Sequence, residues 1–275
     1  MKRKIVLAVA PVSLSVPQGA SCPVDPTAVA EDVVRCSQAG ASIVHLHVRD
    51  AAGQQTEDLS CFDETLQAIR SRSDILIQGS TGGLTTLSLA ERCVSVTHPL
   101  TQSASLNIGS VNFGESVYVN TLPDIRYWCD QMKKHAVTAE LEVFDLSMVR
   151  VGQKLREDGH VAHAQFNICL GFEWALPGTW RALAAMVQEI ERVEGASFGL
   201  IHHGMEDMTL LAAAVGMGAN MIRVGYEDSA WLEPGTVAPT NEALVARAAS
   251  LIRAMGCEVA TPAEAMKLLH IQKES

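Results

Sequence analysis

Short apolar runs alternate with amphipathic segments along this chain of 275 residues. The runs predict eight strands, at residues 4–10, 42–48, 74–78, 102–107, 138–143, 163–168, 197–201 and 221–225. The amphipathic segments predict helices near residues 26–39, 57–71, 85–96, 123–135, 146–158, 179–192, 206–217 and 240–256. Two parallel strands need a crossover between them, so strict alternation of strand and helix indicates a parallel sheet.

Eight strand–helix units in a chain of this length fit a closed (β/α)8 barrel, which typically takes about 250 residues. We therefore expect an α/β protein in which residues 1–275 form a single TIM-barrel domain. A doubly wound open sheet is the alternative. It would often carry a G-x-G-x-x-G turn after the first strand, and the segment APVSLSVPQG at 10–19 lacks one.

Composition narrows the classes of function. With 48% hydrophobic residues the chain can bury a large core, and a net charge of −10 disfavours nucleic acid as a partner. No run approaches the ~20 apolar residues that a membrane span needs. The first twenty residues superficially suggest a signal peptide, but Pro11 interrupts their short apolar stretch, and we interpret it as a buried strand. Seven scattered cysteines without a C-x-x-C pair indicate buried thiols in a reducing, cytoplasmic setting.

The segment SIVHLHVRD at 42–50 places two histidines on one predicted strand. Side chains two residues apart point to the same face of a strand, so His45 and His47 should project together. They could simply be packed or half-exposed histidines. The apolar residues around them indicate a strand buried on both faces, however, and two adjacent buried imidazoles are unfavourable without partners. A shared divalent metal would satisfy both, at the end of the barrel where active sites are built.

A catalytic metal needs at least one more protein ligand and one open position. Candidates follow three other strands: Glu140, Glu142, Asp145, His202, His203, Arg223, Glu227 and Asp228. In a closed barrel the eighth strand lies beside the first, with the second one place further on. A carboxylate just past strand eight can therefore reach His45 and His47.

Two further loops predict polar groups at the barrel mouth. In QGSTGG at 78–83, the N–H groups of Thr81, Gly82 and Gly83 near a helix start would make an anion cradle, although an ordinary glycine turn has the same letters. Asn107 closes the fourth strand and should lie at the mouth.

Several motifs together carry a family resemblance: HLHVRD, STGG, SLNIGSVNFG, RVGYED and the C-terminal NEALVARAASLIRAMGCEVATPAEAMKLL. In this order, over nearly the whole chain, the sequence resembles the β-keto acid cleavage enzymes, whose founding activity cleaves 3-keto-5-aminohexanoate. The combination of H-x-H-x-R with R-V-G-x-E-D is the specific part of the match.

The resemblance implies a zinc-dependent (β/α)8 barrel that condenses a β-keto acid with acetyl-CoA to give acetoacetate and a new acyl-CoA. Carried over by motif, the zinc ligands are His45, His47 and Glu227, and the catalytic pair is Arg223 and Asp228. Ser80 matches the substrate-contacting serine, with the amides after it near the substrate carboxylate. The resemblance also implies a homo-oligomer, expected to be a tetramer.

The sequence departs from the family in two places. Relatives that act on amino-bearing acids carry an acidic residue shortly after the first strand. In this chain Leu14 stands at or next to the matching place, and no acid precedes Asp25. We therefore expect a substrate whose distal end is uncharged. The segment NICLGFEWALPGTW at 167–180 is also unusually aromatic, so Trp174 and Trp180 could line an apolar pocket or pack a helix.

Two other functions remain open from the residues alone. A metal-dependent hydrolase of the amidohydrolase type also uses an H-x-H strand, but normally the first one. A non-catalytic barrel could keep the metal and an acid-binding pocket, although a binder has no use for a base such as Asp228 beside the metal.

Overall fold

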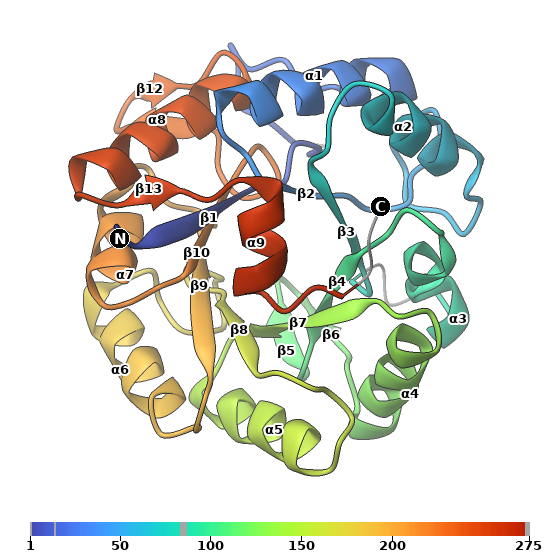
Figure 1. Cartoon of the computed structure of the whole chain (residues 1–275), viewed down its shortest axis with the longest axis vertical. Helices are drawn as coiled ribbons and strands as arrows, with labels where there is room; N and C mark the ends of the chain where they lie inside the picture. Colours follow the sequence, from blue (N-terminus) through green and yellow to red (C-terminus); the bar gives the residue numbers. More distant parts are fainter. Residues whose placement is uncertain (1, 14, 83–86, 273–275) are drawn as a thin grey trace.

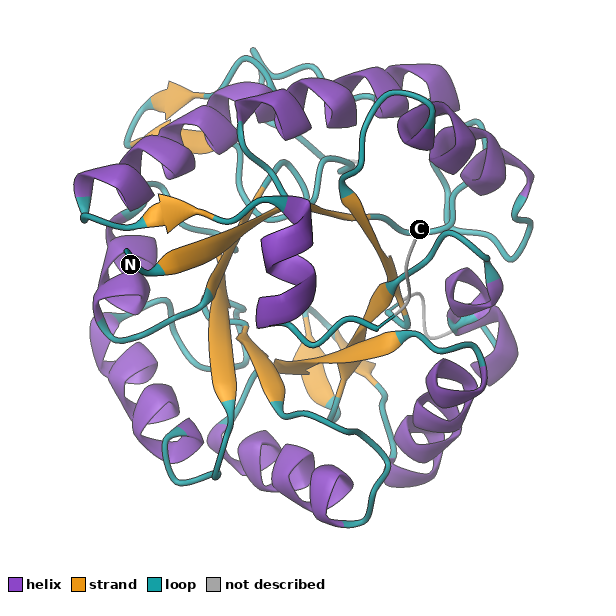
Figure 2. Cartoon of the chain, viewed as in Figure 1, coloured by secondary structure: helices purple, strands orange, loops and turns teal. Residues whose placement is uncertain are grey.

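Eight parallel strands form a closed barrel, as the alternation of strand and helix predicts. The computed structural model describes residues 2–13, 15–82 and 87–272. The strand order is β1-β2-β3-β4-β7-β8-β9-β10, and β10 pairs with β1 to close the ring (Figure 2). The barrel strands are β1 (Lys4–Val9), β2 (Ile43–His45), β3 (Leu76–Ser80), β4 (Ser103–Asn107), β7 (Thr138–Val143), β8 (Gln165–Ile168), β9 (Ser197–Ile201) and β10 (Met221–Val224).

A ring of helices covers the outside of the barrel (Figure 1). Their bounds are α1 (Pro26–Ala39), α2 (Ser60–Arg70), α3 (Leu89–Arg92), the 3-10 helix η1 (Val94–Thr97), α4 (Leu122–Lys134), α5 (Leu146–Glu157), α6 (Trp180–Ile190), α7 (Thr209–Gly216) and α8 (Asn241–Ala254). Most begin at a side chain that accepts a backbone N–H of the first turn; these caps are Asp25, Ser88, Thr121, Asp145, Thr179 and Thr240.

Period-two alternation along the strands divides the core into two clusters. Ile5, Leu7 and Val9 of β1 face outward into the large cluster under the helices. Val6 and Ala8 face inward, where they pack with residues of a last helix, α9 (Pro262–Leu268). The short strand β13 (Glu258–Val259) pairs with β1 and leads into α9, which lies across the barrel in Figure 1. The N-terminal end of the barrel is therefore closed by apolar packing.

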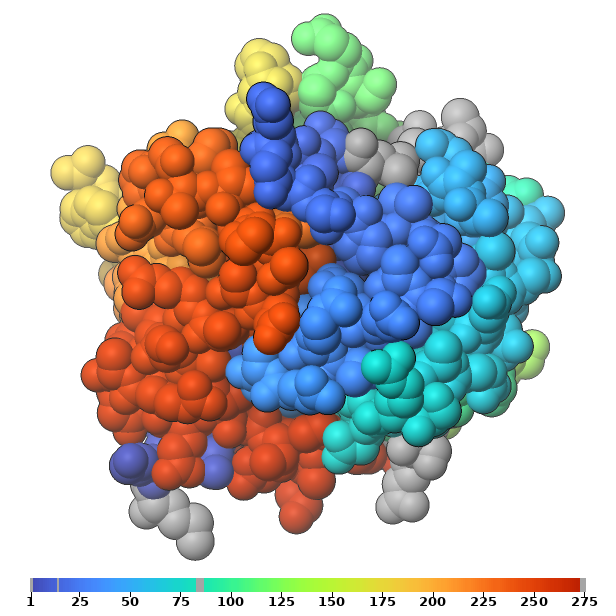
Figure 3. Space-filling view, turned by 90° about the horizontal axis from the view of Figure 1, so that it is seen from above, coloured from blue at the N-terminus to red at the C-terminus, as the bar shows by residue number. Residues whose placement is uncertain are grey.

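Two hairpins lie in the loops after β4 and β10. The first joins β5 (Val111–Phe113) to β6 (Ser116–Tyr118), and the second joins β11 (Trp231–Glu233) to β12 (Thr236–Val237). In Figure 3 the green β5–β6 segment projects from one end of the molecule, and the red C-terminal residues lie toward the other. The first hairpin therefore stands at the open end of the barrel.

Several predicted boundaries are wrong. The second strand ends at His45 instead of residue 48, because the chain beyond it folds into a turn closed by the Arg49–Gln55 bridge. The third strand runs from Leu76 to Ser80 instead of 74–78, since its pairing with β4 continues to Ser80. The helix expected at 85–96 is a four-residue α-helix from Leu89 followed by η1, and part of that range lies outside the described residues.

Candidate active site at the C-terminal end of the barrel

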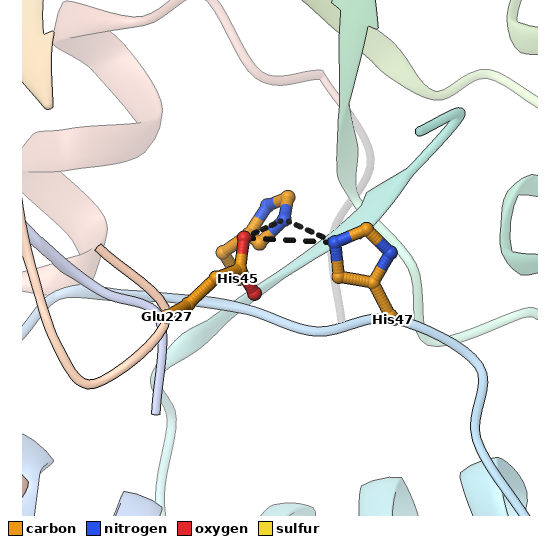
Figure 4. A group of neighbouring side chains, drawn as sticks. All are labelled: His45, His47 and Glu227. Carbon is orange, nitrogen blue, oxygen red and sulfur yellow. Dashed lines mark hydrogen bonds and ion pairs between the residues drawn. The ribbon is translucent and has the colours of Figure 1, made fainter. Parts of the chain in front are cut away.

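His45, His47 and Glu227 point their donor atoms toward one another (Figure 4). The two Nε2 atoms are 3.4 Å apart, and Glu227 Oε1 lies 3.5 Å from that of His45 and 3.6 Å from that of His47. His45 is buried, while His47 and Glu227 are half-buried. The cluster is thus anchored in the barrel wall and exposed on one side.

Barrel closure explains how residues so distant in sequence meet. Ala8 of β1 pairs on one side with Ile43 of β2 and on the other with Arg223 of β10. The ends of β2 and β10 therefore flank the same strand. Beyond β10, Gly225 adopts a φ of 135°, and the N–H of Glu227 donates to the carbonyl of Ala10 at 3.1 Å. This turn folds Glu227 back over the end of β1 toward the histidines.

The three donor atoms fit a divalent metal. A tetrahedral zinc site with bonds of about 2.0–2.1 Å separates its ligand atoms by about 3.3–3.4 Å. The observed triangle of 3.4, 3.5 and 3.6 Å is nearly that of one tetrahedral face. The local charge also favours a bound cation. The single guanidinium of Arg223 contacts three carboxylates, those of Glu142, Glu227 and Asp228. A cation at the triad would offset the excess negative charge.

Each histidine is held through its other ring nitrogen by a glutamine that the sequence analysis missed. His45 Nδ1 lies 2.8 Å from Gln78 Oε1, and His47 Nδ1 lies 3.1 Å from Gln55 Nε2. Gln78 therefore accepts a hydrogen bond from His45 Nδ1–H, whereas Gln55 donates a hydrogen bond to His47 Nδ1. If the Gln55 amide group were rotated by 180°, its oxygen would accept a hydrogen bond from His47 Nδ1–H. His47 Nε2 would then carry no proton and could bind a metal. Gln78 stands two residues before Ser80 on β3, a strand-face relationship that could have identified it.

Arg223 and Asp228 form a buried pair beside the triad. Arg223 Nε donates to Asp228 Oδ2 at 2.8 Å, and Nη2 donates to Oδ1 at 2.6 Å. Burial raises the pKa of Asp228 to about 6, although the charge of Arg223 opposes the rise. Burial also raises the pKa of Glu142 to about 7, again opposed by Arg223. An Asp228 carboxylate with that pKa is both ionised near neutral pH and a stronger base than an exposed aspartate.

Charge and burial also act on the triad itself. Burial lowers the pKa of His45 to about 3, so its imidazole stays neutral, the form that binds metals. Burial opposes the ionisation of Glu227, but the two imidazoles lower the pKa of this carboxyl below its ordinary value. A neutral His45 and an ionised Glu227 are the protonation states that a metal site requires.

Ser80 and Asn107 reach the same space from β3 and β4. Ser80 Oγ accepts the N–H of Gly82 at 2.8 Å and lies 3.2 Å from Ser105 Oγ. Asn107 Nδ2 donates to the hydroxyl of Tyr118 on β6 at 2.9 Å, whereas its buried Oδ1 has no hydrogen-bond partner among the described residues. Asn107 Oδ1 is thus a polar atom placed to meet a ligand.

Two of the N–H groups expected to bind an anion already donate to other groups of the protein. The N–H of Thr81 donates to Ser105 O at 3.0 Å, within the barrel wall, and that of Gly82 donates to Ser80. Gly82 still packs close to the site, because a Cβ there would lie 2.9 Å from Tyr118 OH and 3.5 Å from His47 Cε1. Gly83 and Leu14, the other two predicted contact residues, lie outside the described residues.

The remaining candidates for a third ligand have other partners. Asp145 caps α5 by accepting the N–H of Ser147, and His202 Nε2 lies 2.7 Å from Asp207 O. His203 stacks on Phe172, with ring centroids 3.6 Å apart. Trp174 and Trp180 are 54% and 60% exposed, so neither packs under a helix. In the aromatic segment at 167–180, Phe172 is the residue that turns toward the barrel mouth.

Comparison with known proteins decides the family. The model of the beta-keto acid cleavage enzyme family matches residues 4–271. The chain belongs to the beta-keto acid cleavage enzyme family. A 3-keto-5-aminohexanoate cleavage enzyme of Fusobacterium nucleatum is 33% identical over 89% of each chain. A 3-oxoadipate:acetyl-CoA acetyltransferase of Cupriavidus necator is 33% identical over 98% of this chain and 95% of its own.

Solved structures agree on the fold. ObcA in a binary complex with oxaloacetate superposes with a TM-score of 0.77 over 91% of this chain and 67% of the ObcA chain. Its sequence identity of 18% makes this a likeness of fold alone. Within residues 2–13, 15–82 and 87–272, no helix combines the length and apolar character that a membrane span needs.

Proposed function

We propose that this protein transfers acyl groups between a β-keto acid and acetyl-CoA, giving acetoacetate and the CoA thioester of the shortened acid. The observation that carries the proposal is the buried Arg223–Asp228 pair, two hydrogen bonds at 2.8 and 2.6 Å, set beside the His45–His47–Glu227 triad. Membership of the family, with relatives named as acetyl-CoA transferases, supplies the reaction class. A base beside a metal triad is what abstraction of a proton next to a carbonyl requires.

We propose zinc as the metal, held by His45, His47 and Glu227. When bound, it would supply a Lewis acid that favours loss of a proton from C2 of the β-keto acid. Ser80 Oγ and Asn107 Oδ1, which reach the site from β3 and β4, would orient the substrate. The backbone around Thr81, Gly82 and Gly83 would lie near its carboxylate.

Asp228 would act as the base. Its carboxylate accepts the C2 proton and becomes neutral, while Arg223 holds Asp228 in place and offsets the negative charge that develops on the substrate. The C2 carbanion attacks the acetyl carbonyl of acetyl-CoA, a carbon–carbon bond forms, and CoA thiolate leaves. The thiolate then adds to the original keto carbon, the C2–C3 bond breaks, and acetoacetate leaves after taking its proton back from Asp228. Protons, electrons and carbon atoms balance without a covalent link to the protein.

The proposed substrate has an uncharged distal end. The resemblance places Leu14 at or next to the position where amino-recognising relatives carry an acid. Phe113 of the β5–β6 hairpin and Phe172 of the 167–180 segment also form an aromatic pair, with ring centroids 5.3 Å apart. Apolar walls favour an alkyl group over an ammonium.

We also propose that residues 1–275 form one domain and that the chain works as a homo-oligomer, a tetramer, in the cytoplasm. Seven cysteines, none of them in a disulfide, support a reducing compartment. Light scattering coupled to gel filtration measures the oligomeric state directly.

An isotope-labelled screen tests the reaction. Purified protein is incubated with acetyl-CoA carrying ¹³C in both acetyl carbons and with a panel of β-keto acids, and the products are read by mass spectrometry. We expect both labelled carbons in acetoacetate, at C3 and C4, and an unlabelled acyl-CoA. Turnover of the acid without acetyl-CoA would instead indicate a hydrolase, and failure of every acid to react would overturn the proposal.

A further inference from the structure

A buried network of hydrogen-bonded side chains connects Glu140 to His45 of the proposed metal site. Glu140 on β7 accepts a hydrogen bond from Asn167 Nδ2 of β8 at 2.8 Å. Burial raises the pKa of the Glu140 carboxyl, and a hydrogen bond from the Gln78 side chain opposes the rise. Gln78 Oε1 in turn lies 2.8 Å from His45 Nδ1. Glu140, Gln78, Asn167 and His45 are all buried. This network lies inside the barrel, below its open end, and its four residues come from four strands.

The direction of each hydrogen bond follows from the contact between Gln78 and His45. The amide oxygen of Gln78 faces His45 Nδ1, so the amide N–H group is the part of Gln78 that is left to donate to Glu140. An oxygen only accepts, so His45 must carry its proton on Nδ1. Its Nε2 is left with a bare lone pair, directed at His47 Nε2 and Glu227 Oε1.

His47 differs from His45, because its Nδ1 faces the nitrogen of a glutamine amide instead of the oxygen. The nitrogen of Gln55, from the turn at 49–55, faces His47 Nδ1 at 3.1 Å and donates to it. With the Gln55 amide in this orientation, a neutral His47 carries its proton on Nε2, pointing into the triad. His45 is therefore the histidine whose tautomer already suits a metal, whereas His47 needs the Gln55 amide to turn.

We propose that Glu140 is a positioning residue which, through Gln78, holds His45 in the tautomer that binds the metal. This inference deepens the proposed function, on whose metal site it rests. Partners of this kind set ring orientation and tautomer in metal sites, and their loss typically lowers metal affinity about 10–100-fold. Among the described residues, Glu140 forms no hydrogen bond or ion pair with the triad or with Asp228, although the charge of Arg223 lowers the pKa of its carboxyl. The hydrogen-bonded route from Glu140 to His45 passes through Gln78.

Two single variants and one double variant test the chain of hydrogen bonds. Gln78→Met removes the acceptor for His45 at similar volume, and Glu140→Met leaves the Gln78 amide unanchored, so that its N–H can turn to His45. Both should bind zinc about 10–100-fold more weakly in a chelator competition. The double variant Gln78→Glu with Glu140→Gln keeps an acceptor facing His45 and a donor facing position 78, and should restore affinity toward that of wild type.

Histidine tautomers supply a readout that a merely structural role would not change. In ¹⁵N NMR of the metal-free wild type, we expect His45 protonated on Nδ1 and His47 on Nε2. In Glu140→Met the His45 signals should shift toward the other tautomer. Gln165→Met is the matched control, because Gln165 is a buried barrel glutamine bonded to Asn220 and Ser197 instead of to the site. It should leave zinc affinity and the tautomers unchanged.

The outcomes separate this inference from the proposed function. Wild-type zinc affinity in both single variants, or a metal-free His45 protonated on Nε2, would overturn the positioning role while leaving the metal site intact. A wild type that binds no metal would refute the zinc site, yet the NMR comparison would still decide whether Glu140 sets the tautomer of His45. Circular dichroism confirms that each variant is folded.

Discussion

Arg223 and Asp228 are five positions apart in sequence, yet the guanidinium of the first binds the carboxylate of the second through two hydrogen bonds, at 2.8 and 2.6 Å. The contact is made because β10 ends at Val224 and the chain reverses at Gly225, bringing Asp228 back over the strand that carries Arg223. The same reversal delivers Glu227 to the histidines. One turn thus assembles the proposed base and the proposed third metal ligand.

Replacing the proposed base should abolish turnover but not the fold. Asp228→Asn keeps the shape and one acceptor for Arg223 but removes the basic carboxylate, so kcat should fall by ~10²–10⁴ while metal content stays constant. Asp145→Asn is the matched control, since Asp145 is exposed, caps α5 by accepting the N–H of Ser147, and is replaced by a residue that caps equally well. Near-normal kcat in Asp228→Asn would assign the base to another residue.

Removing one imidazole should empty the metal site. In His47→Ala the triangle of donor atoms loses a corner, and the remaining His45 and Glu227 hold a divalent ion weakly. Elemental analysis after dialysis should find about one zinc per wild-type chain and little in the variant. His163→Ala, which removes a histidine stacked on His270, should keep its zinc. Full occupancy in His47→Ala would disprove the assignment.

Substrate choice should depend on residue 14. The wild type should prefer 3-oxohexanoate over 3-keto-5-aminohexanoate by roughly 100-fold or more in kcat/KM, because an unpaired buried ammonium costs several kcal/mol. Leu14→Glu should narrow or reverse this ratio by supplying a counter-charge, whereas Leu14→Met should not. If the wild type prefers the amino compound, another acid recognises the ammonium and our interpretation of Leu14 fails.

The turn at Gly225 should tolerate no side chain. Its φ is 135°, and a Cβ would lie 2.3 Å from the carbonyl oxygen of Ala10. Gly225→Ala should therefore lower the free energy of unfolding by roughly 3 kcal/mol or more. Gly235→Ala shares a positive φ but meets nothing within 4 Å, so it should cost only about 1 kcal/mol. Urea denaturation of both variants compares the two, and equal losses would show that contact with Ala10 is unimportant.

The alternation of eight apolar runs with helical segments was enough to predict the closed barrel, because each parallel pairing forces a crossover and the chain has the length for eight. Boundaries were less predictable. The strand carrying His45 stops two residues before His47, since hydrogen bonds of the 49–55 turn compete with continued pairing. The pattern of apolar residues along the strand does not show whether the turn or continued strand pairing is more stable.

By itself the sequence determined which residues meet at the site. His45 and His47 follow from strand spacing. Barrel closure brings a carboxylate past the eighth strand within reach of them, and the family motif selects Glu227. The tertiary structure alone decided how these residues are held. Gln55, Glu140 and Tyr118 come from other strands and turns, so no spacing rule links them to the histidines. Gln78 shares a strand face with Ser80, but the spacing does not show that its amide oxygen faces His45. The direction of a hydrogen bond depends on which buried group faces which, and that is settled only when β2, β3, β7 and β8 come together in one closed barrel.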